Sequence, residues 1–173
     1  MVDNFIQVPN IHWNLLYFQR ILILESIKNI ANLVKGDLLD IGCGTQPYRS
    51  LFKEIKSYTG IDVNSSCHEL SPDVIIYDGE SIPFPPNSFD WAMSTEVFEH
   101  IRRPDLLLQS LFDVLRPGGC FFLTVPFLAG IHEAPYDFRR WTNYGLVEEL
   151  SRAGFERIEV RPLGNWHMGC TKR

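Results

Sequence analysis

A short glycine-containing segment is where the sequence first offers residues suited to chemistry. Gly42 and Gly44 directly follow the largely apolar run 38–41. Glycines at such a point let the backbone turn sharply and let a ligand approach the main chain closely. A dinucleotide motif would place a third glycine where Pro47 stands, and no Lys-Ser/Thr pair follows as in a phosphate-binding loop. Because Asp40 would also repel a phosphate, the segment predicts a nucleoside ligand with a cationic or zwitterionic tail.

Two ionisable groups later in the chain could act on a second substrate. Glu96 and His100 are four residues apart, so on a helix they would share one face, although an ordinary surface pair explains them equally well. The segment 132–142 brings His132, aromatic rings and two arginines into one loop. In an alternative interpretation the polar side chains of this loop bind one another rather than a ligand, and Asp137 pairs with Arg139 or Arg140.

The elements that must position these residues follow from the hydrophobic pattern. It predicts helices over 13–34, 48–56, 104–115 and 146–153, and strands over 38–41, 58–63, 74–77, 89–94, 120–125 and 155–160. Alternating strands and helices predict an α/β fold with a doubly wound, mostly parallel sheet. Ligands of such sheets bind beyond the carboxyl ends of the strands. Asp62 and Asp78 fall at two of these ends.

Length and composition set the remaining limits. The chain has 173 residues, 45% of them hydrophobic and 21% charged, which is typical of one globular domain. We expect a helical cap over 1–35, a core over 36–162 and a tail over 163–173. The formal net charge of −5 argues against a nucleic-acid partner. Four scattered cysteines, no signal-peptide pattern and no long apolar run predict a cytoplasmic protein without a membrane span.

In a series of ordered blocks the sequence resembles the class I S-adenosylmethionine-dependent methyltransferases, specifically the methyltransferase type 11 group. Residues 38–46 match their first motif, hydrophobic-hydrophobic-Asp-x-Gly-x-Gly-x-Gly, except that Gln46 replaces the last glycine. The segments 60–63, 78–90, 96–101, 115–119 and 154–155 then follow in the family's order. The resemblance covers roughly residues 36–160. It implies a Rossmann-like fold and S-adenosylmethionine as the cofactor.

The resemblance also implies roles for residues at the first three strand ends. Asp62 would accept hydrogen bonds from both ribose hydroxyls, which suits a group with two acceptor oxygens. Asp78, with Gly79 beside it, would meet the adenine amino group, although an Asp before a Gly is also a common turn. Gly42, Gly44 and Asp40 would hold the methionine part of the cofactor. Gln46 would touch its tail.

By the same resemblance the methyl acceptor lies beyond the fourth and fifth strands. We therefore expect Glu96, Tyr136, Arg139 and Arg140 to bind a small-molecule acceptor. His132 and His100 are the candidate bases. The sulfonium already activates the methyl group, so we expect no metal.

The family sheet has seven strands, and too little chain follows residue 160 for the last of them. An exposed sheet edge predicts a monomer, or a homodimer paired through that edge. The main alternative function is a non-catalytic cofactor-binding module or partner subunit. A further alternative is another enzyme that uses a nucleoside cofactor on the same sheet.

Overall fold

The computed structural model describes residues 15–66 and 68–163, and within them a five-stranded, wholly parallel sheet forms the centre. The strands lie in the order β3-β2-β1-β4-β5. Their bounds are β1 Gly36–Ile41, β2 Ile55–Val63, β3 Ile75–Tyr77, β4 Phe89–Thr95 and β5 Leu115–Thr124. The chain starts in the middle of the sheet, builds outward to β3 and then returns to build the other half. This order confirms the predicted doubly wound, Rossmann-like fold.

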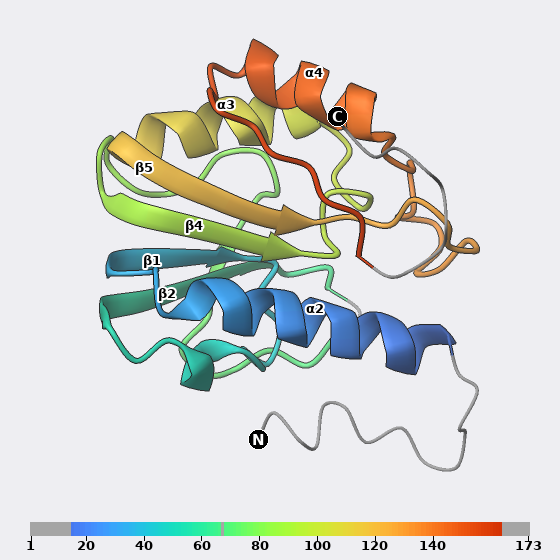
Figure 1. Cartoon of the computed structure of the whole chain (residues 1–173), viewed down its shortest axis with the longest axis horizontal. Helices are drawn as coiled ribbons and strands as arrows, with labels where there is room; N and C mark the ends of the chain where they lie inside the picture. The colour runs from blue at the N-terminus through green and yellow to red at the C-terminus, as the bar shows by residue number, and fades with distance from the viewer. Residues whose placement is uncertain (1–14, 67, 164–173) are drawn as a thin grey trace, which may run out of the picture.

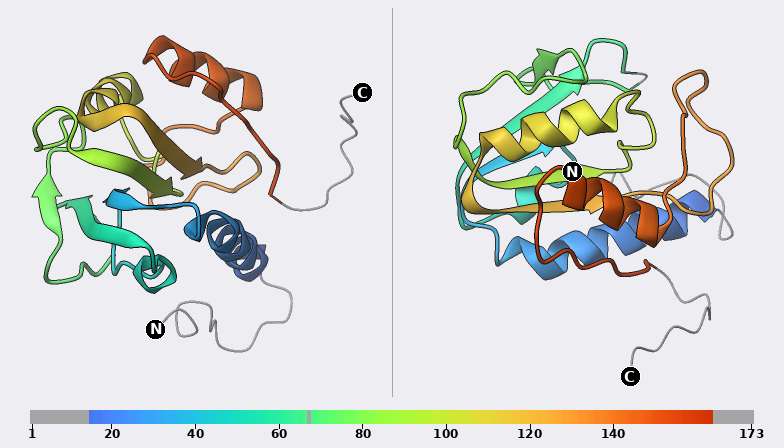
Figure 2. Two further views of the ribbon diagram at one scale, coloured as in Figure 1. Left: turned by 60° about the vertical axis from the view of Figure 1, so that its left-hand side comes forward. Right: turned by 90° about the horizontal axis from the view of Figure 1, so that it is seen from above.

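Helices cover both faces of the sheet (Figure 1). One face carries α2 and the short 3-10 helix η1, and the other carries α3 and α4, which the two views of Figure 2 also show. The helix bounds are α2 Leu15–Ala31, η1 Arg49–Leu51, α3 Pro104–Val114 and α4 Asn143–Arg152. The molecule is therefore a three-layer α/β/α domain.

Alternating side chains of β1 explain why both faces need a helical cover. Leu38 is buried with Ile27 of α2 and Met93 of β4 in one core cluster. Leu39, the next residue, is buried in the other cluster with Leu107 of α3 and further apolar residues. Successive residues of a strand point to opposite faces, so an apolar run such as Leu38-Leu39 requires packing on both sides.

The predicted helix over 48–56 is wrong, because sheet pairing takes the end of that segment. Ile55 already belongs to β2 and pairs with Gly36 of β1. Between the glycine turn and this strand only the 3-10 turn over Arg49–Leu51 remains, and the two residues that flank it, Tyr48 and Phe52, are buried in the cluster that contains Ile27 of α2. A short connection that buries two aromatic rings therefore stands where the hydrophobic pattern predicts a helix.

The predicted strand over 155–160 is also absent. Arg157 has a φ of +54°, which interrupts an extended conformation, and no described strand pairs with this segment. Phe155 instead packs against Phe112 of α3 and Phe121 of β5, with ring centroids 5.4 and 5.9 Å away. A seventh strand would fall in residues 164–173, which lie outside the described part of the chain. Among the described residues, no helix is long and apolar enough to cross a membrane.

Candidate cofactor and acceptor site

The glycine turn lies at the carboxyl end of β1, as the sequence predicts. Gly42 and Gly44 have φ values of +69° and +49°, a region that glycine enters without steric cost. The amide of Gly42 donates to the carbonyl of Ile61 in β2 at 2.9 Å, which fixes the turn against the neighbouring strand. A Cβ placed on Gly42 would lie 2.3 Å from Val97 Cγ2, so no side chain fits there.

Asp62 sits beside this turn at the end of β2 and is buried. Its Oδ2 accepts a hydrogen bond from the Gly44 amide at 2.8 Å, and its Oδ1 accepts one from the Val63 amide at 2.7 Å. These bonds fix the carboxylate against the turn. Each oxygen can still accept a second hydrogen bond, which is what a ribose diol requires. The residues present therefore fit the nucleoside part of S-adenosylmethionine.

Asp40 belongs to β1, two residues before Gly42, and is only 2% exposed. Tyr58 of β2 donates its hydroxyl hydrogen to Asp40 Oδ2. Burial, together with the nearby negative charge of Asp62, raises the pKa of Asp40 to about 7 against the opposing effect of the Tyr58 hydrogen bond. A cation brought to this carboxyl would favour its ionised form, as the predicted ammonium group of the cofactor would.

Asp78 forms the turn after β3. Its Oδ1 accepts hydrogen bonds from the amides of Ser81 and Glu80 at 2.7 and 2.8 Å, and these bonds lower its pKa. Gly79 has a φ of +88°, and a Cβ there would touch Val63 Cγ1 at 3.4 Å. The Asp78-Gly79 turn is thus next to the residue that follows Asp62, which brings the predicted adenine and ribose contacts together.

The side chain of Gln46 is engaged away from the glycine turn. Its Nε2 donates to Asp73 at 2.9 Å, and its Oε1 accepts from Arg49 at 2.8 Å. Gln46 also has a φ of +56°, where the family motif has its third glycine. The backbone conformation of that position is therefore retained, and the side chain ties η1 to the segment before β3. A contact of Gln46 with the cofactor stays a prediction.

Residues 96–100 follow β4 at the same edge of the sheet. They form a turn in which the His100 amide donates to the Val97 carbonyl at 2.8 Å, so the expectation that Glu96 and His100 share a helical face is wrong. Glu96 has a φ of +54° and accepts a hydrogen bond from Gln19 of α2. Its amide donates to the Thr124 carbonyl at the end of β5 at 3.0 Å. These bonds fix the turn between the sheet and α2.

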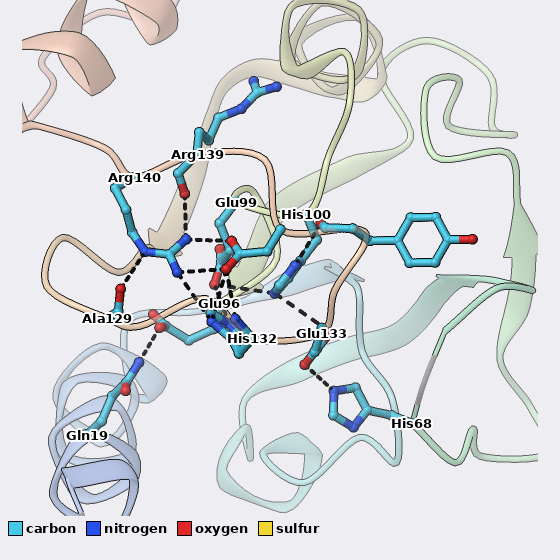
Figure 3. Close-up of polar contacts among 12 residues, drawn as sticks. Gln19, His68, Glu96, Glu99, His100, Ala129, His132, Glu133, Arg139 and Arg140 are labelled. Carbon is cyan, nitrogen blue, oxygen red and sulfur yellow. Dashed lines mark hydrogen bonds and ion pairs between the residues drawn. The ribbon is translucent and has the colours of Figure 1, made fainter.

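The turn and the loop after β5 meet at Glu99 (Figure 3). The Glu99 side chain is fully buried, and its Oε1 lies 3.7 Å from His100 Nε2 and 3.8 Å from His132 Nε2. The two histidine rings are edge to face, with centroids 4.8 Å apart. Both predicted bases therefore converge on one carboxyl group. The burial of that group, together with the nearby negative charge of Glu96, raises its pKa to about 8.

The loop after β5 is closed by a pair between Arg140 and Asp137. This confirms, for these two residues, the alternative in which the polar side chains of the loop bind one another. Arg140 makes a two-pronged ion pair with Asp137 at 2.5 and 2.8 Å and donates to the carbonyls of Ala129 and Gly130. Arg139 extends away from the cluster in Figure 3, and its guanidinium stacks over Trp141. Contacts of Arg139 and Arg140 with an acceptor stay predictions.

Tyr136 contributes its backbone to the site. Its carbonyl oxygen lies 3.0 Å from His100 Nδ1, and its side chain is 48% exposed. A contact of the Tyr136 ring with an acceptor stays a prediction.

Glu99 and the pair of His68 with Glu133 are residues that the sequence patterns do not single out. His68 Nε2 lies 2.9 Å from Glu133 Oε1, which joins the segment after β2 to the loop after β5. The amide of Ser71, in the same segment as His68, donates to the Gly44 carbonyl at 3.1 Å. The sequence points to Glu99 only through its position next to His100. Its burial could not be predicted, because burial depends on tertiary contacts.

The sheet order, the glycine turn and the acids at successive strand ends define an α/β domain that binds a nucleoside cofactor. Residues 17–166 match the family described as "Methyltransferase domain". The chain belongs to this family and is a class I S-adenosylmethionine-dependent methyltransferase domain.

Individual relatives differ in what their names say they act on. The chain is 26% identical over 165 residues to a ubiquinone/menaquinone biosynthesis C-methyltransferase, UbiE, of Nitrosospira multiformis, covering 70% of this chain and 68% of that one. It is 34% identical over 94 residues to a tRNA (carboxymethyluridine(34)-5-O)-methyltransferase of Schizosaccharomyces pombe, covering 52% of this chain and 41% of that one.

Among solved structures, that of the [4+2]-cyclase SpnF is similar with a TM-score of 0.64 and 26% identity. The match covers 88% of this chain and 63% of that one. This chain therefore spans less than half of the tRNA methyltransferase and about two thirds of the other two proteins.

Proposed function

We propose that this domain transfers the methyl group of S-adenosylmethionine to a small-molecule acceptor bound beside Glu96, His100 and His132. The observation that carries the proposal is the contact of Gly42 with Val97, because it places the cofactor turn directly against the segment that bears Glu96 and His100. A methyl donor and an acceptor held on either side of this contact would be neighbours. In-line placement of two bound reactants supplies much of the rate of such a transfer.

On the cofactor side, this chain's residues bind and orient. Asp62 would hold the ribose, Asp78 and Gly79 the adenine, and the backbone of Gly42 and Gly44 the methionine part. Asp40 would face the ammonium group. When bound, the cofactor supplies a methyl carbon activated by its sulfonium.

On the acceptor side, His132 or His100 would take the proton of a hydroxyl or amine acceptor. His132 is held by its backbone amide, which donates to Asp137 at 2.9 Å, so the closed loop sets the position of its ring. Carboxyl groups of Glu96, Glu99 and Glu133 surround the two rings, which disfavours a polyanionic acceptor such as tRNA. The broad match to a quinone-biosynthesis enzyme supports a small-molecule acceptor. A cytoplasmic location and a monomeric or dimeric state stay predictions.

The test is methyl transfer from isotope-labelled S-adenosylmethionine to pooled small molecules bearing hydroxyl, amine or acidic C–H groups. We expect a labelled product together with S-adenosylhomocysteine, and a rate at least tenfold lower for His132→Asn. Transfer to tRNA but to no small molecule would overturn the acceptor class.

The likeness to SpnF, whose named activity is a cyclisation, favours a second candidate, a domain that binds the cofactor without transferring its methyl group. Cofactor binding with no transfer to any acceptor would support that candidate.

A further inference from the structure

Glu99 is the most unusual polar group in the described part of the chain. Its side chain is fully buried, and neither carboxyl oxygen has a hydrogen-bond partner. A buried carboxyl without partners costs several kcal/mol when it is ionised. Such a group is retained where something else binds it, and the side chains that face it indicate what that is.

Two imidazole nitrogens face Glu99, and each ring is oriented from its far side. His100 Nδ1 lies 3.0 Å from the Tyr136 carbonyl oxygen, and His132 Nδ1 lies 3.2 Å from the Gly130 carbonyl oxygen. A carbonyl oxygen accepts only, so Nδ1 is the donor in each of these two contacts, although Arg140 Nη2 also approaches His132 Nδ1 at a longer 3.4 Å. With the hydrogen on Nδ1, a neutral imidazole has its Nε2 lone pair on the side of Glu99. Histidines that ligate metals are held in the same way by backbone carbonyls.

The distances fit a site that closes on an ion. The ligand atoms of Glu99, His100 and His132 all lie within 4.8 Å of one another. Metal–ligand bonds of about 2.1 Å place adjacent ligand atoms roughly 3.0–3.4 Å apart. The two contacts with Glu99, at 3.7 and 3.8 Å, are slightly longer than this. Side-chain rotation would have to bring the three ligand atoms closer together for all of them to bind one ion.

The surrounding charge favours a cation. Glu133 Oε2 lies 3.7 Å from His100 Nε2, and the carboxyl of Glu96 raises the pKa of Glu99 through its negative charge. The guanidinium of Arg140, whose positive charge lowers the pKa of Glu99, is held in a two-pronged pair with Asp137. Three carboxyl groups thus lie around the two rings.

We propose that Glu99, His100 and His132 form a binding site for a divalent transition-metal ion, which would bind and polarise an oxygen of the methyl acceptor. Two imidazoles and one carboxylate on one side of an ion are ligands suited to Mn²⁺, Fe²⁺, Co²⁺ or Zn²⁺ rather than to Mg²⁺ or Ca²⁺. This departs from the expectation of no metal. The ligands lie in two loops, and only the fold brings them together.

The chemical role rests on the proposed function, whereas the ion binding does not. A polarised acceptor hydroxyl loses its proton to water more readily, so with the ion bound His100 and His132 would act as its ligands and water would replace them as the base. The oxygen then forms a bond to the methyl carbon while the carbon–sulfur bond breaks. The bonding electron pair stays on sulfur, which leaves S-adenosylhomocysteine. The ion would also hold the acceptor oxygen at a fixed place beside the glycine turn.

The test uses the full chain without an affinity tag, treated with a chelator and then titrated with Co²⁺. We expect a visible d–d absorption band that saturates at one ion per chain, with a matching calorimetric isotherm. Glu99→Gln and His132→Asn should each weaken Co²⁺ binding at least tenfold. His68→Asn is the matched control, because His68 is exposed and pairs with Glu133 outside the three ligands, and it should bind Co²⁺ within twofold of the unchanged chain.

Binding of S-adenosylhomocysteine to every variant shows that each is folded. No saturable Co²⁺ signal in a chain that binds S-adenosylhomocysteine would overturn the metal site and leave the proposed function standing. Equal Co²⁺ affinity in Glu99→Gln and the unchanged chain would also overturn it. Co²⁺ binding by the three ligands in a chain that binds no S-adenosylhomocysteine would support the site and remove the proposed function.

Discussion

Gly42 and Val97 are in contact across the carboxyl edge of the sheet, so closely that a Cβ on the glycine would lie 2.3 Å from Val97 Cγ2. Gly42 belongs to the turn proposed to bind the cofactor, and Val97 lies between Glu96 and Glu99 in the turn proposed to bind the acceptor. A change in the position of one turn must therefore displace the other. The proposed function therefore predicts that cofactor binding and acceptor placement are coupled through this contact.

We predict that Gly42→Ala weakens S-adenosylhomocysteine binding at least tenfold, as measured by calorimetry. The new methyl group would push Val97 and the turn apart, and the φ of +69° adds about 1–2 kcal/mol of backbone strain. Gly118→Ala is the matched control: its φ is +80°, but no atom lies within 4 Å of the added Cβ. It should lose only the stability that the backbone strain costs and should keep its affinity. Equal affinity in both variants would contradict the coupling.

The pKa of Asp40, raised to about 7 by burial, predicts how stability depends on pH. The folded chain holds this proton more tightly than the unfolded chain does, so the contribution of Asp40 to stability is fully present below about pH 4. It is lost as pH rises to 7 and above. Asp40→Asn should therefore be more stable than the unchanged chain at pH 8, by about 2–4 kcal/mol, and should show no gain at pH 4. Urea unfolding at the two pH values measures this difference.

The same group predicts a pH dependence of cofactor binding. An ammonium group placed beside Asp40 favours the ionised carboxyl, so affinity for S-adenosylhomocysteine should rise as pH increases from 6 to 8. Tyr58→Phe removes a hydrogen bond that lowers the pKa of Asp40, so the rise should move to higher pH. In Asp40→Asn the affinity should be flat over this range. An equally steep rise in Asp40→Asn would assign the effect to another group.

Much of this arrangement could be predicted from local sequence. An apolar run predicts β1, the two glycines that follow it predict the tight turn, and Asp62 stands at the end of the next apolar run. The helix predicted over 48–56 and the strand predicted over 155–160 fail for a different reason. Pairing of Ile55 with β1 and packing of Phe155 on β5 are tertiary contacts, and they override local pattern. Glu99 belongs to the same class: nothing in its own neighbourhood in sequence indicates that the fold buries it.

The ion pair of Arg140 with Asp137 predicts that the loop after β5 depends on one buried carboxylate. Arg140 holds the pKa of Asp137 well below its usual range, and the Asp137 side chain is almost fully buried. Arg140→Met should leave that charge without its main partner, at a cost of about 3 kcal/mol. Amide hydrogen exchange over residues 127–140 should become at least tenfold faster.

Arg152→Met is the control for this loop, since Arg152 makes exposed pairs that contribute less than about 1 kcal/mol. Its exchange over the same residues should be unchanged. S-adenosylhomocysteine affinity should stay within twofold for both variants. Unchanged exchange in Arg140→Met would show that the loop is held by other contacts.

The most direct test of the account is calorimetric titration of the chain with S-adenosylhomocysteine, compared with Asp62→Ala and with the control Asp113→Asn on the exposed surface of α3. We predict saturable binding to the unchanged chain and to Asp113→Asn, at least tenfold weaker binding to Asp62→Ala, and no binding of NADH to any of them. Equal affinity in Asp62→Ala, or binding of NADH in place of S-adenosylhomocysteine, would contradict the assignment of the cofactor site.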